Sequence, residues 1–115
     1  MPSSRAYHLK AGMLRHRVAI QSEVNTRDAI GGVAKTWSTD ATVWANIRPL
    51  SGRELIAAQQ VDSRVTHEIT VREYSGLNSN MRFLHESRAF NIVSVRDIDE
   101  RDKLQICQAI EDTGE

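Results

Sequence analysis

The residues best suited to bind a metal ion are the histidines, the single cysteine and one run of acidic residues. The histidines lie at His8, His16, His67 and His85. They show no H-x-x-x-H or C-x-x-C spacing of the kind that supplies ligands to zinc. Residues 97–102 are acidic, but they lack the central glycine and the terminal glutamate of a calcium loop. We therefore expect no metal ion and no cofactor.

Residues that act as nucleophiles or bind phosphate also lack the context that such chemistry requires. Ser51 has no G-x-S-x-G motif around it, and a role at a helix terminus already accounts for it. Gly31 and Gly32 are not followed by a lysine–threonine pair or by a strand-to-helix pattern, so they do not form a phosphate-binding loop. Cys107 falls in an apolar strand pattern and is expected to be a small buried residue. The sequence therefore favours a protein that is not an enzyme.

Residues 42–48 alternate between two faces with the period of a half-buried strand. The apolar face holds Val43, Ala45 and Ile47. The opposite face holds Trp44, Asn46 and Arg48. Pro49 cannot donate a ladder hydrogen bond, so the strand is expected to end there.

A short helix is predicted at residues 52–60, within an insert that spans residues 51–62. Leucine, alanine and glutamine dominate the segment, and they favour helix over strand. Ser51 and Glu54 have the S-x-x-E spacing of a capping box, in which each side chain bonds the backbone amide of the other residue. The period of two returns at Val65 and places His67 on the apolar face, where a hydrogen-bonded core or interface histidine is expected rather than a ligand.

The strands are short and evenly spaced, which is typical of a barrel or a sandwich. They are expected at residues 14–21, 35–37, 42–48, 65–73, 81–85, 88–96 and 104–109. Val18 and Ile20 should point inward. Connections are expected as a long flexible segment at 23–34 and as turns at 38–40, 75–80, 86–87 and 97–102. The predicted fold class is all-β, a small antiparallel β-barrel of about six or seven strands with one short helix inserted between two strands.

Length and composition indicate one domain over residues 1–115. Fifteen basic and fifteen acidic residues cancel, which argues against the broad basic surface of a dedicated nucleic-acid-binding protein. No apolar run approaches the roughly 18 residues of a membrane span, and the basic N-terminus lacks the apolar segment of a secretory signal. The single cysteine suits synthesis in a reducing cytoplasm. Residues 1–11 are polar and are expected to form a flexible arm.

Two features of the central segment indicate contact with a partner. Trp44 is either covered by the helical insert, which we favour, or exposed to a partner, because tryptophan is enriched at contact hot spots. Three arginines flank the insert: Arg48, Arg53 and Arg64. They are candidates to face DNA, to pair with carboxylates of a neighbouring subunit or simply to be solvated, and the sequence does not rank these alternatives.

The segment VWANIRPLSGRELIAAQQVDSRVTHEITVR, preceded by LRHRVAIQ and by GG and TW, resembles the bacteriophage head-closure family, also called head–tail joining or stopper proteins. The similarity continues through residues 81–83, 88–92 and 99–101 and covers residues 12–108. The resemblance implies a small β-barrel subunit in a ring of six-fold or twelve-fold symmetry. Such a ring lies below the portal and adaptor at the neck of a tailed phage, closes the DNA-filled head and offers a docking surface to the tail.

The resemblance also implies partners, and the residues of the helical insert together with Trp44 indicate an interface. The partners are further copies of the chain, the portal or adaptor protein, a tail terminator or tail tube protein, and non-specifically bound double-stranded DNA, with no membrane. The expected interface residues are Trp44, Ser51, Arg53, Glu54, Leu55, Ile56 and Val61. Charge pairs at its rim would come from Arg53 and Glu54. The residues expected to face DNA in the lumen are Arg48, Arg53 and Arg64.

Residues 51–62 are also the candidate gate that narrows the lumen. The flexible segments at residues 1–11 and 24–34 are expected to become ordered only in the assembled neck. One alternative keeps the architecture and makes the chain an adaptor or tail-completion component of the same neck. A second alternative is a small nucleic-acid-binding β-barrel, against which the neutral charge and the small number of aromatic residues count.

Overall fold

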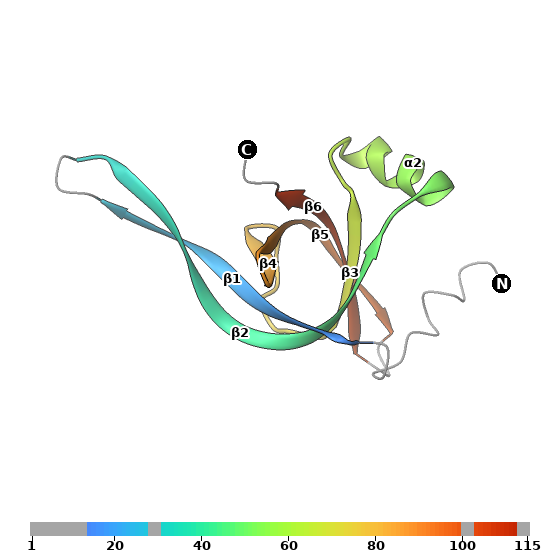
Figure 1. Ribbon diagram of the computed structural model, residues 1–115, viewed down its shortest axis with the longest axis horizontal. Coiled ribbons are helices and arrows are strands. Elements are labelled where there is room, and N and C mark those ends of the chain that lie inside the picture. The colour runs from blue at the N-terminus through green and yellow to red at the C-terminus, as the bar shows by residue number, and fades with distance from the viewer. Residues whose placement is uncertain (1–13, 28–30, 100–102, 113–115) are drawn as a thin grey trace.

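The computed structural model describes residues 14–27, 31–99 and 103–112. The elements in chain order are β1 (His16–Arg27), β2 (Val33–Pro49), α2 (Gly52–Val61), β3 (His67–Arg72), β4 (Met81–His85), β5 (Arg88–Asp99) and β6 (Leu104–Asp112). The six strands in this part of the chain close into an antiparallel barrel in the order β1-β2-β3-β6-β5-β4, with α2 outside it (Figure 1). The predicted all-β barrel with one inserted helix is confirmed.

The barrel interior is filled by the inward-facing side chains of all six strands. The core consists of Val18, Ile20, Ala45, Ile69, Val71, Met81, Phe83, Phe90, Ile92, Cys107 and Ala109. Alternation predicted the inward positions of Val18 and Ile20, and both are fully buried. Cys107 is also fully buried, as expected of a small apolar residue. The strand that contains residues 42–48 ends at Pro49, as the missing amide of proline requires.

The prediction of a long connection at residues 23–34 is wrong. β1 continues to Arg27 and β2 begins at Val33, so most of this segment is a long two-stranded hairpin that extends away from the barrel (Figure 1). The turn expected at residues 38–40 is wrong as well, because β2 runs through it without interruption. Ile20 pairs with Ala41 while Gln21 pairs with Thr39, so Asp40 is the extra residue of a β-bulge.

Two other connections follow the prediction, and a third follows it only in part. Residues 75–80 form turns, and β4 and β5 are joined through a two-residue turn at Glu86 and Ser87, where Glu86 has φ 56°. β5 continues to Asp99, so residues 97–99 of the expected charged turn are strand. Residues 100–102 and the arm at residues 1–11 lie outside the described part of the chain.

Candidate interaction site

The inner side of α2 packs on a small apolar cluster outside the main core. Leu50, Ala58 and Val65 are its buried members, and Leu55 and Val93 pack against them. Ala58 is 4% exposed, and it is the one buried residue of the helix. The side-chain amide of Gln59 donates to the backbone carbonyl of Val65 at 3.1 Å, which ties the helix to the segment leading into β3. α2 therefore has a fixed position on the barrel.

The N-terminus of α2 is held by an arginine rather than by a capping box. Ser51 occupies the N-cap position with an extended backbone, but its side chain makes no capping hydrogen bond. Arg48 instead donates to both carboxylate oxygens of Glu54, at 2.7 and 3.0 Å, and to Glu68 Oε1 at 2.6 Å. The predicted capping hydrogen bond of Ser51 is therefore wrong. A bidentate, charge-assisted bond to Arg48 engages the carboxylate on which the capping box depends.

The two carboxylates set the electrostatics of Arg48. The hydrogen bond to Glu54 raises the pKa of the Arg48 guanidinium, burial opposes that rise, and Glu68 adds to it. Arg64 pairs with Asp62 at 3.1 Å, and this contact lowers the pKa of the Asp62 carboxyl. Two of the three arginines expected at the DNA-facing surface thus pair with carboxylates of their own subunit. Arg53 is exposed at the first turn of the helix.

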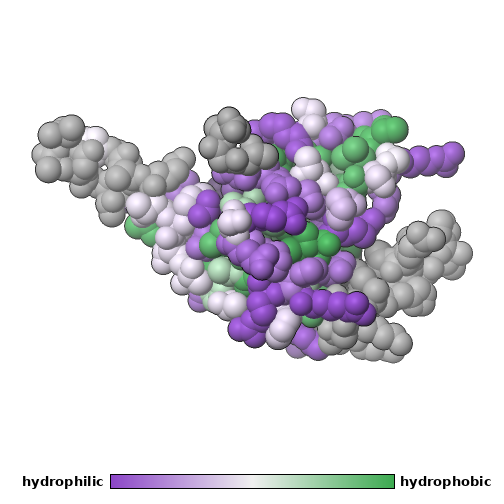
Figure 2. All heavy atoms as spheres, in the orientation of Figure 1, coloured by the Kyte–Doolittle hydropathy of each residue, from purple (hydrophilic) through white to green (hydrophobic). Residues whose placement is uncertain are grey.

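The outer side of α2 presents apolar side chains to solvent. Ile56 is 63% exposed and Val61 is 79% exposed. Figure 2 shows hydrophobic residues gathered over α2, next to strongly hydrophilic ones. Leu55, which was predicted at the interface with them, is instead half-buried in the cluster beneath the helix. Ser51 and Glu54 are exposed at the helix start. The large apolar side chains that the helix exposes are therefore Ile56 and Val61.

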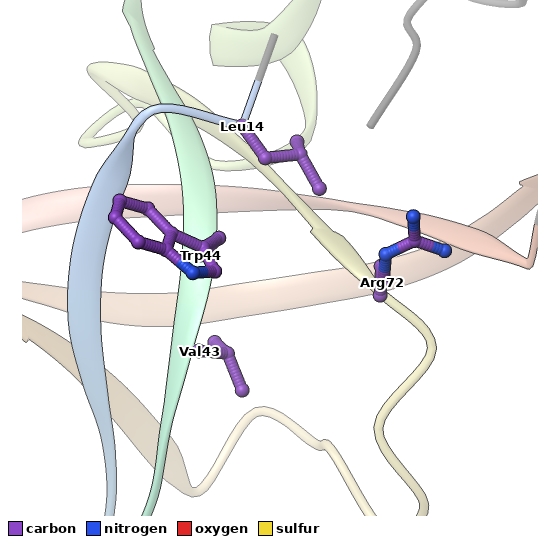
Figure 3. A pocket seen from close by; sticks show the side chains of 4 residues that line it. All are labelled: Leu14, Val43, Trp44 and Arg72. Atoms are coloured by element: carbon purple, nitrogen blue, oxygen red, sulfur yellow. The ribbon is translucent and has the colours of Figure 1, made fainter. Parts of the chain in front are cut away.

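Trp44 lies away from α2, so the prediction that the helical insert covers it is wrong. The side chain is 50% exposed, and the guanidinium carbon of Arg17 lies 5.0 Å from the centre of its ring. With Leu14, Val43 and Arg72 it lines an open cleft of about 470 Å³, at the place where β2 and β3 separate (Figure 3). The reason is geometric. Residue 44 precedes Ala45, the first β2 residue that pairs with β3, whereas the insert follows the last one.

A second cluster fixes His67 at the far end of β3. His67 is buried, its ring meets Phe90 edge-on at 5.0 Å between centroids, and its Nε2 lies 3.9 Å from Glu111. Arg88 donates to Glu111 at 2.8 Å. Burial lowers the pKa of the His67 imidazole and Arg88 adds to this, while Glu111 opposes it. The expectation of a hydrogen-bonded core histidine is confirmed, because Nδ1 lies 2.8 Å from the Thr66 hydroxyl.

A group of side chains that the sequence did not reveal lies at the base of the β1–β2 hairpin. The Arg82 guanidinium lies 4.3 Å from the centre of the Trp37 ring. Arg82 also donates to Gln21 at 2.7 Å, and Gln21 donates to Thr39 at 3.1 Å. We call these four residues the hairpin clamp. No local pattern predicts it, because its members come from three strands and meet only through the barrel's register.

The described residues contain no group of three or more His, Cys, Asp or Glu side chains placed to hold a metal ion. Burial raises the pKa of the Cys107 thiol to about 12, so this side chain remains a neutral thiol. Within the same residues, no helix is long and apolar enough to cross a membrane. The described surface has three features suited to contact with another molecule: the outer side of α2, the cleft at Trp44 and the projecting β1–β2 hairpin.

Comparison with known proteins identifies the family. The family model described as phage head completion protein matches residues 9–112. The solution structure of protein SF1141 from Shigella flexneri 2a is 25% identical over 93% of this chain and 100% of that chain, with a TM-score of 0.73. A chain in the virion of a native gene transfer agent particle is 20% identical over 88% of this chain and 97% of that chain, with a TM-score of 0.59. None of the curated proteins matches the chain significantly.

The family match covers nearly all of the described barrel together with α2. The gene transfer agent chain, at its lower identity, shows the shared fold. The chain belongs to the phage head completion protein family, a family of structural proteins of the virion.

Proposed function

We propose that this protein is a head-closure subunit that forms a ring at the virion neck, retains packaged DNA and offers a docking surface to the tail. The observation that carries the proposal is the family match over residues 9–112. A subunit of 115 residues can close a channel only by repeating around it. Head-to-tail packing with rotational closure produces such a ring.

The geometry of α2 supports a role in contacts between neck proteins. The helix is tied to the barrel by Arg48 on one side and by the Ala58 cluster beneath it, yet Ile56 and Val61 remain exposed. Removing one such side chain from water contributes about 1.5–3 kcal/mol, and a ring repeats that contribution at each subunit. We propose Ile56 and Val61 as its main apolar contacts, with Trp44, Ser51 and Arg53 contributing at other points.

The charge distribution limits how α2 meets DNA or a neighbour. Arg48 and Arg64 are already paired within the subunit, so their contribution to a basic lumen is reduced. Glu54 is held by Arg48, which leaves Arg53 as the better candidate for a rim contact or for facing DNA. Such a contact is worth little by itself and acts through repetition. We propose residues 51–62 as the element that narrows the lumen.

The nucleic-acid-binding alternative finds less support in the placement of the aromatic side chains. Phe83 and Phe90 are fully buried in the core. Trp37 is half-buried beneath Arg82, and Trp44 is half exposed beside Arg17. Base stacking requires aromatic faces that lie open along a groove. The portal or adaptor on the head side and a tail protein on the other side therefore remain the partners that we propose.

The proposal is tested by the double variant Ile56→Ser/Val61→Ser, compared with the control Ala57→Ser/Gln60→Ser. All four residues are exposed, so both variants should fold and melt within a few degrees of the parent. This design is sharper than replacing residues 51–62 by a Gly-Ser linker, because that change also uncovers Leu50 and Val65.

Both variants are then assembled into particles. The apolar-to-serine variant should yield heads that lose DNA or fail to join tails, while the control yields tailed, infectious particles. Electron microscopy and a nuclease-protection assay of packaged DNA measure the two outcomes. Intact infectious particles from the Ile56→Ser/Val61→Ser variant would show that the outer side of α2 has no part in head closure.

A further inference from the structure

The cleft lined by Leu14, Val43, Trp44 and Arg72, which we call the Trp44 cleft, opens where β2 and β3 separate. Ala45 and Val71 are the last pair of the ladder at this end, and both belong to the core. Trp44 and Arg72 are each one position further along, so they lie on the outer face of the barrel. Val43 packs against the core. The cleft therefore leads from the outer surface to the edge of the core.

Apolar side chains form most of the lining. Figure 3 shows Trp44 and Arg72 on opposite sides of the cleft, with Leu14 and Val43 between them. The volume of about 470 Å³ is in the range of pockets that hold ligands. Trp44 is 50% exposed, and tryptophan offers a large contact area at a small cost in side-chain entropy. An apolar side chain that enters the cleft would therefore be stabilised there.

Two arginines flank Trp44 across the strands. Arg17 pairs with Trp44 in the ladder, and its guanidinium carbon lies 5.0 Å from the centre of the indole ring. Arg72 lies on the opposite side, and both arginine side chains are exposed. Neither forms an ion pair within the described residues. Three arginines elsewhere on the described surface are each paired with a carboxylate: Arg48, Arg64 and Arg88.

The described acidic residues near the cleft do not cancel this charge. Glu73 follows Arg72 and is exposed, but its backbone amide bonds the carbonyl of Lys103, which brings a further cation to the same place. Asp40 lies four residues before Trp44, about 14 Å along an extended strand, beyond the screening length of about 8 Å at physiological salt. The described surroundings of the cleft are therefore positively charged.

This combination of an apolar lining and a basic rim restricts the occupant. Double-stranded DNA would pair with the arginines through its phosphates but would leave the apolar lining exposed to water. A second copy offers three large apolar side chains that are exposed among the described residues: Val24, Ile56 and Val61. The carboxylates next to them in the chain already interact within their own subunit: Glu23, Glu54 and Asp62. A segment of another protein, with carboxylates on both sides of an apolar residue, matches the lining and the rim together.

We propose that the Trp44 cleft binds such an acidic segment of another neck protein. One large apolar side chain enters between Trp44 and Val43, and the flanking carboxylates pair with Arg17 and Arg72. Arginine suits this role because its guanidinium can bind a carboxylate through two parallel hydrogen bonds. Tryptophan and arginine are also enriched among the residues that dominate binding energies. The proposal rests on the proposed place of the protein in the neck, and it assigns a contact separate from α2.

Photo-cross-linking identifies the occupant. Thr42 is exposed and lies two residues before Trp44, on the same face of β2. It is replaced by p-benzoyl-phenylalanine, and the control carries the same probe at the exposed Ser79 in the turn before β4. Purified particles and the cells that produce them are irradiated, and the cross-linked peptides are sequenced by mass spectrometry.

The expected product joins residue 42 to a peptide of another virion protein in which acidic residues flank an apolar one, and the Ser79 control does not give it. A cross-link to DNA, to a second copy or within the same chain would each overturn the inference. Absence of any cross-link at residue 42 would overturn it as well.

Titration of a synthetic peptide with the cross-linked sequence tests the chemistry of the contact. Arg17→Gln/Arg72→Gln should weaken binding about tenfold, because each exposed ion pair contributes a few-fold. The control Arg96→Gln removes another exposed arginine and should bind like the parent. Serine in place of the apolar residue of the peptide should also weaken binding. Equal affinity of the parent and the double arginine variant would refute the assigned pairs.

The experiments separate this inference from the proposed function. Filled, tailed particles that contain the probe at residue 42 but give no cross-link to an acidic segment reject the cleft contact and leave head closure standing. Filled, tailed particles that assemble without the subunit contradict head closure, and the cross-link formed in the producing cells then decides the cleft contact by itself.

Discussion

The attachment of α2 to the barrel can be measured by comparing two neighbouring alanines of the helix. Ala58 is 4% exposed and packs with Leu50 and Val65, whereas Ala57 is exposed. Changing either residue to glycine removes one methyl group and raises the backbone entropy of the unfolded helix equally. The difference between Ala58→Gly and Ala57→Gly therefore isolates the packing of the helix on the barrel.

The structure gives the size of each effect. Alanine to glycine in a helix interior costs about 1 kcal/mol. At Ala58 the loss of a buried methyl group adds about 0.8 kcal/mol, with a further small cost for the space left behind. We expect Ala57→Gly to destabilise α2 by about 1 kcal/mol and Ala58→Gly by about 2 kcal/mol, which correspond to roughly 5-fold and 30-fold increases in helix opening.

Native-state hydrogen exchange is the assay, because it reports local opening separately from global unfolding. The amides of Leu55 and Asp62 bond carbonyls of Ser51 and Ala58, each at 3.3 Å, and report on the two ends of the helix. They should exchange faster in the order parent, Ala57→Gly, Ala58→Gly, with much smaller changes at barrel amides. Equal acceleration in both variants would refute the reasoning, since it would mean that the packing beneath α2 contributes nothing.

Two further predictions concern charged groups. Because burial holds the pKa of His67 below its usual value of 6.5, the unfolded chain binds a proton first as the pH falls, so stability should decrease below about pH 6.5. Glu111, whose pKa is lowered by Arg88, adds a further loss of stability as the pH falls below 4.5. Urea titrations from pH 8 to 4 measure the free energy of unfolding, which should depend less on pH in His67→Gln than in the parent. An unchanged pH dependence would contradict this account. Double-mutant cycles by thermal unfolding measure the coupling energies of Arg48. The coupling to Glu54 should be at most about 0.5 kcal/mol because both side chains are well exposed, and the coupling to the less exposed Glu68 should be larger. A larger coupling to Glu54 than to Glu68 would contradict this prediction.

The parts of the fold that could be predicted are those where one face of a strand enters the core. Alternation at residues 42–48 placed Ala45 inside, and alternation from Val65 placed Ile69 and Val71 inside, because the barrel has a dry interior and a wet exterior. The α2 helix was predicted for a related reason. Its leucine, alanine and glutamine residues favour helix, and Pro49 ends the strand before it.

The part of the β1–β2 hairpin that extends beyond the barrel could not be predicted because none of its described side chains belongs to the barrel core. Apolar and polar residues alternate only where one face of a strand lies on a core, so alternation does not reveal this hairpin. The strongest local signal comes from Asn25, Gly31 and Gly32, which are typical of a loop. The same limit applies to Trp44. Its outward direction followed from alternation, but whether the insert covered it depended on where β3 begins to pair with β2. Sequence periodicity carries no information on that register.

The sequence predicted which elements form the candidate site, but it did not predict the contacts between their side chains. Ser51 occupies the N-cap position as expected, but Arg48 holds Glu54 from a different element, across six positions of the chain. A capping box and an arginine pair draw on the same carboxylate, and the bidentate pair also reaches Glu68. Local spacing identifies which groups are able to bond, and the tertiary fold decides between them.

Arg48 and Arg82 play parallel parts in positioning the two elements outside the core. Arg48 joins α2 to β2 and β3 through carboxylates, and Arg82 joins the β1–β2 hairpin to β4 through Trp37 and Gln21. The two joints differ in chemistry. The ion pair of Arg48 with Glu54 is exposed and weakens as salt screens it, whereas the Arg82 guanidinium over the Trp37 ring keeps its dispersion contacts in salt. High ionic strength should therefore loosen the start of α2 before it loosens the base of the β1–β2 hairpin, so contacts made by the two elements can be separated experimentally.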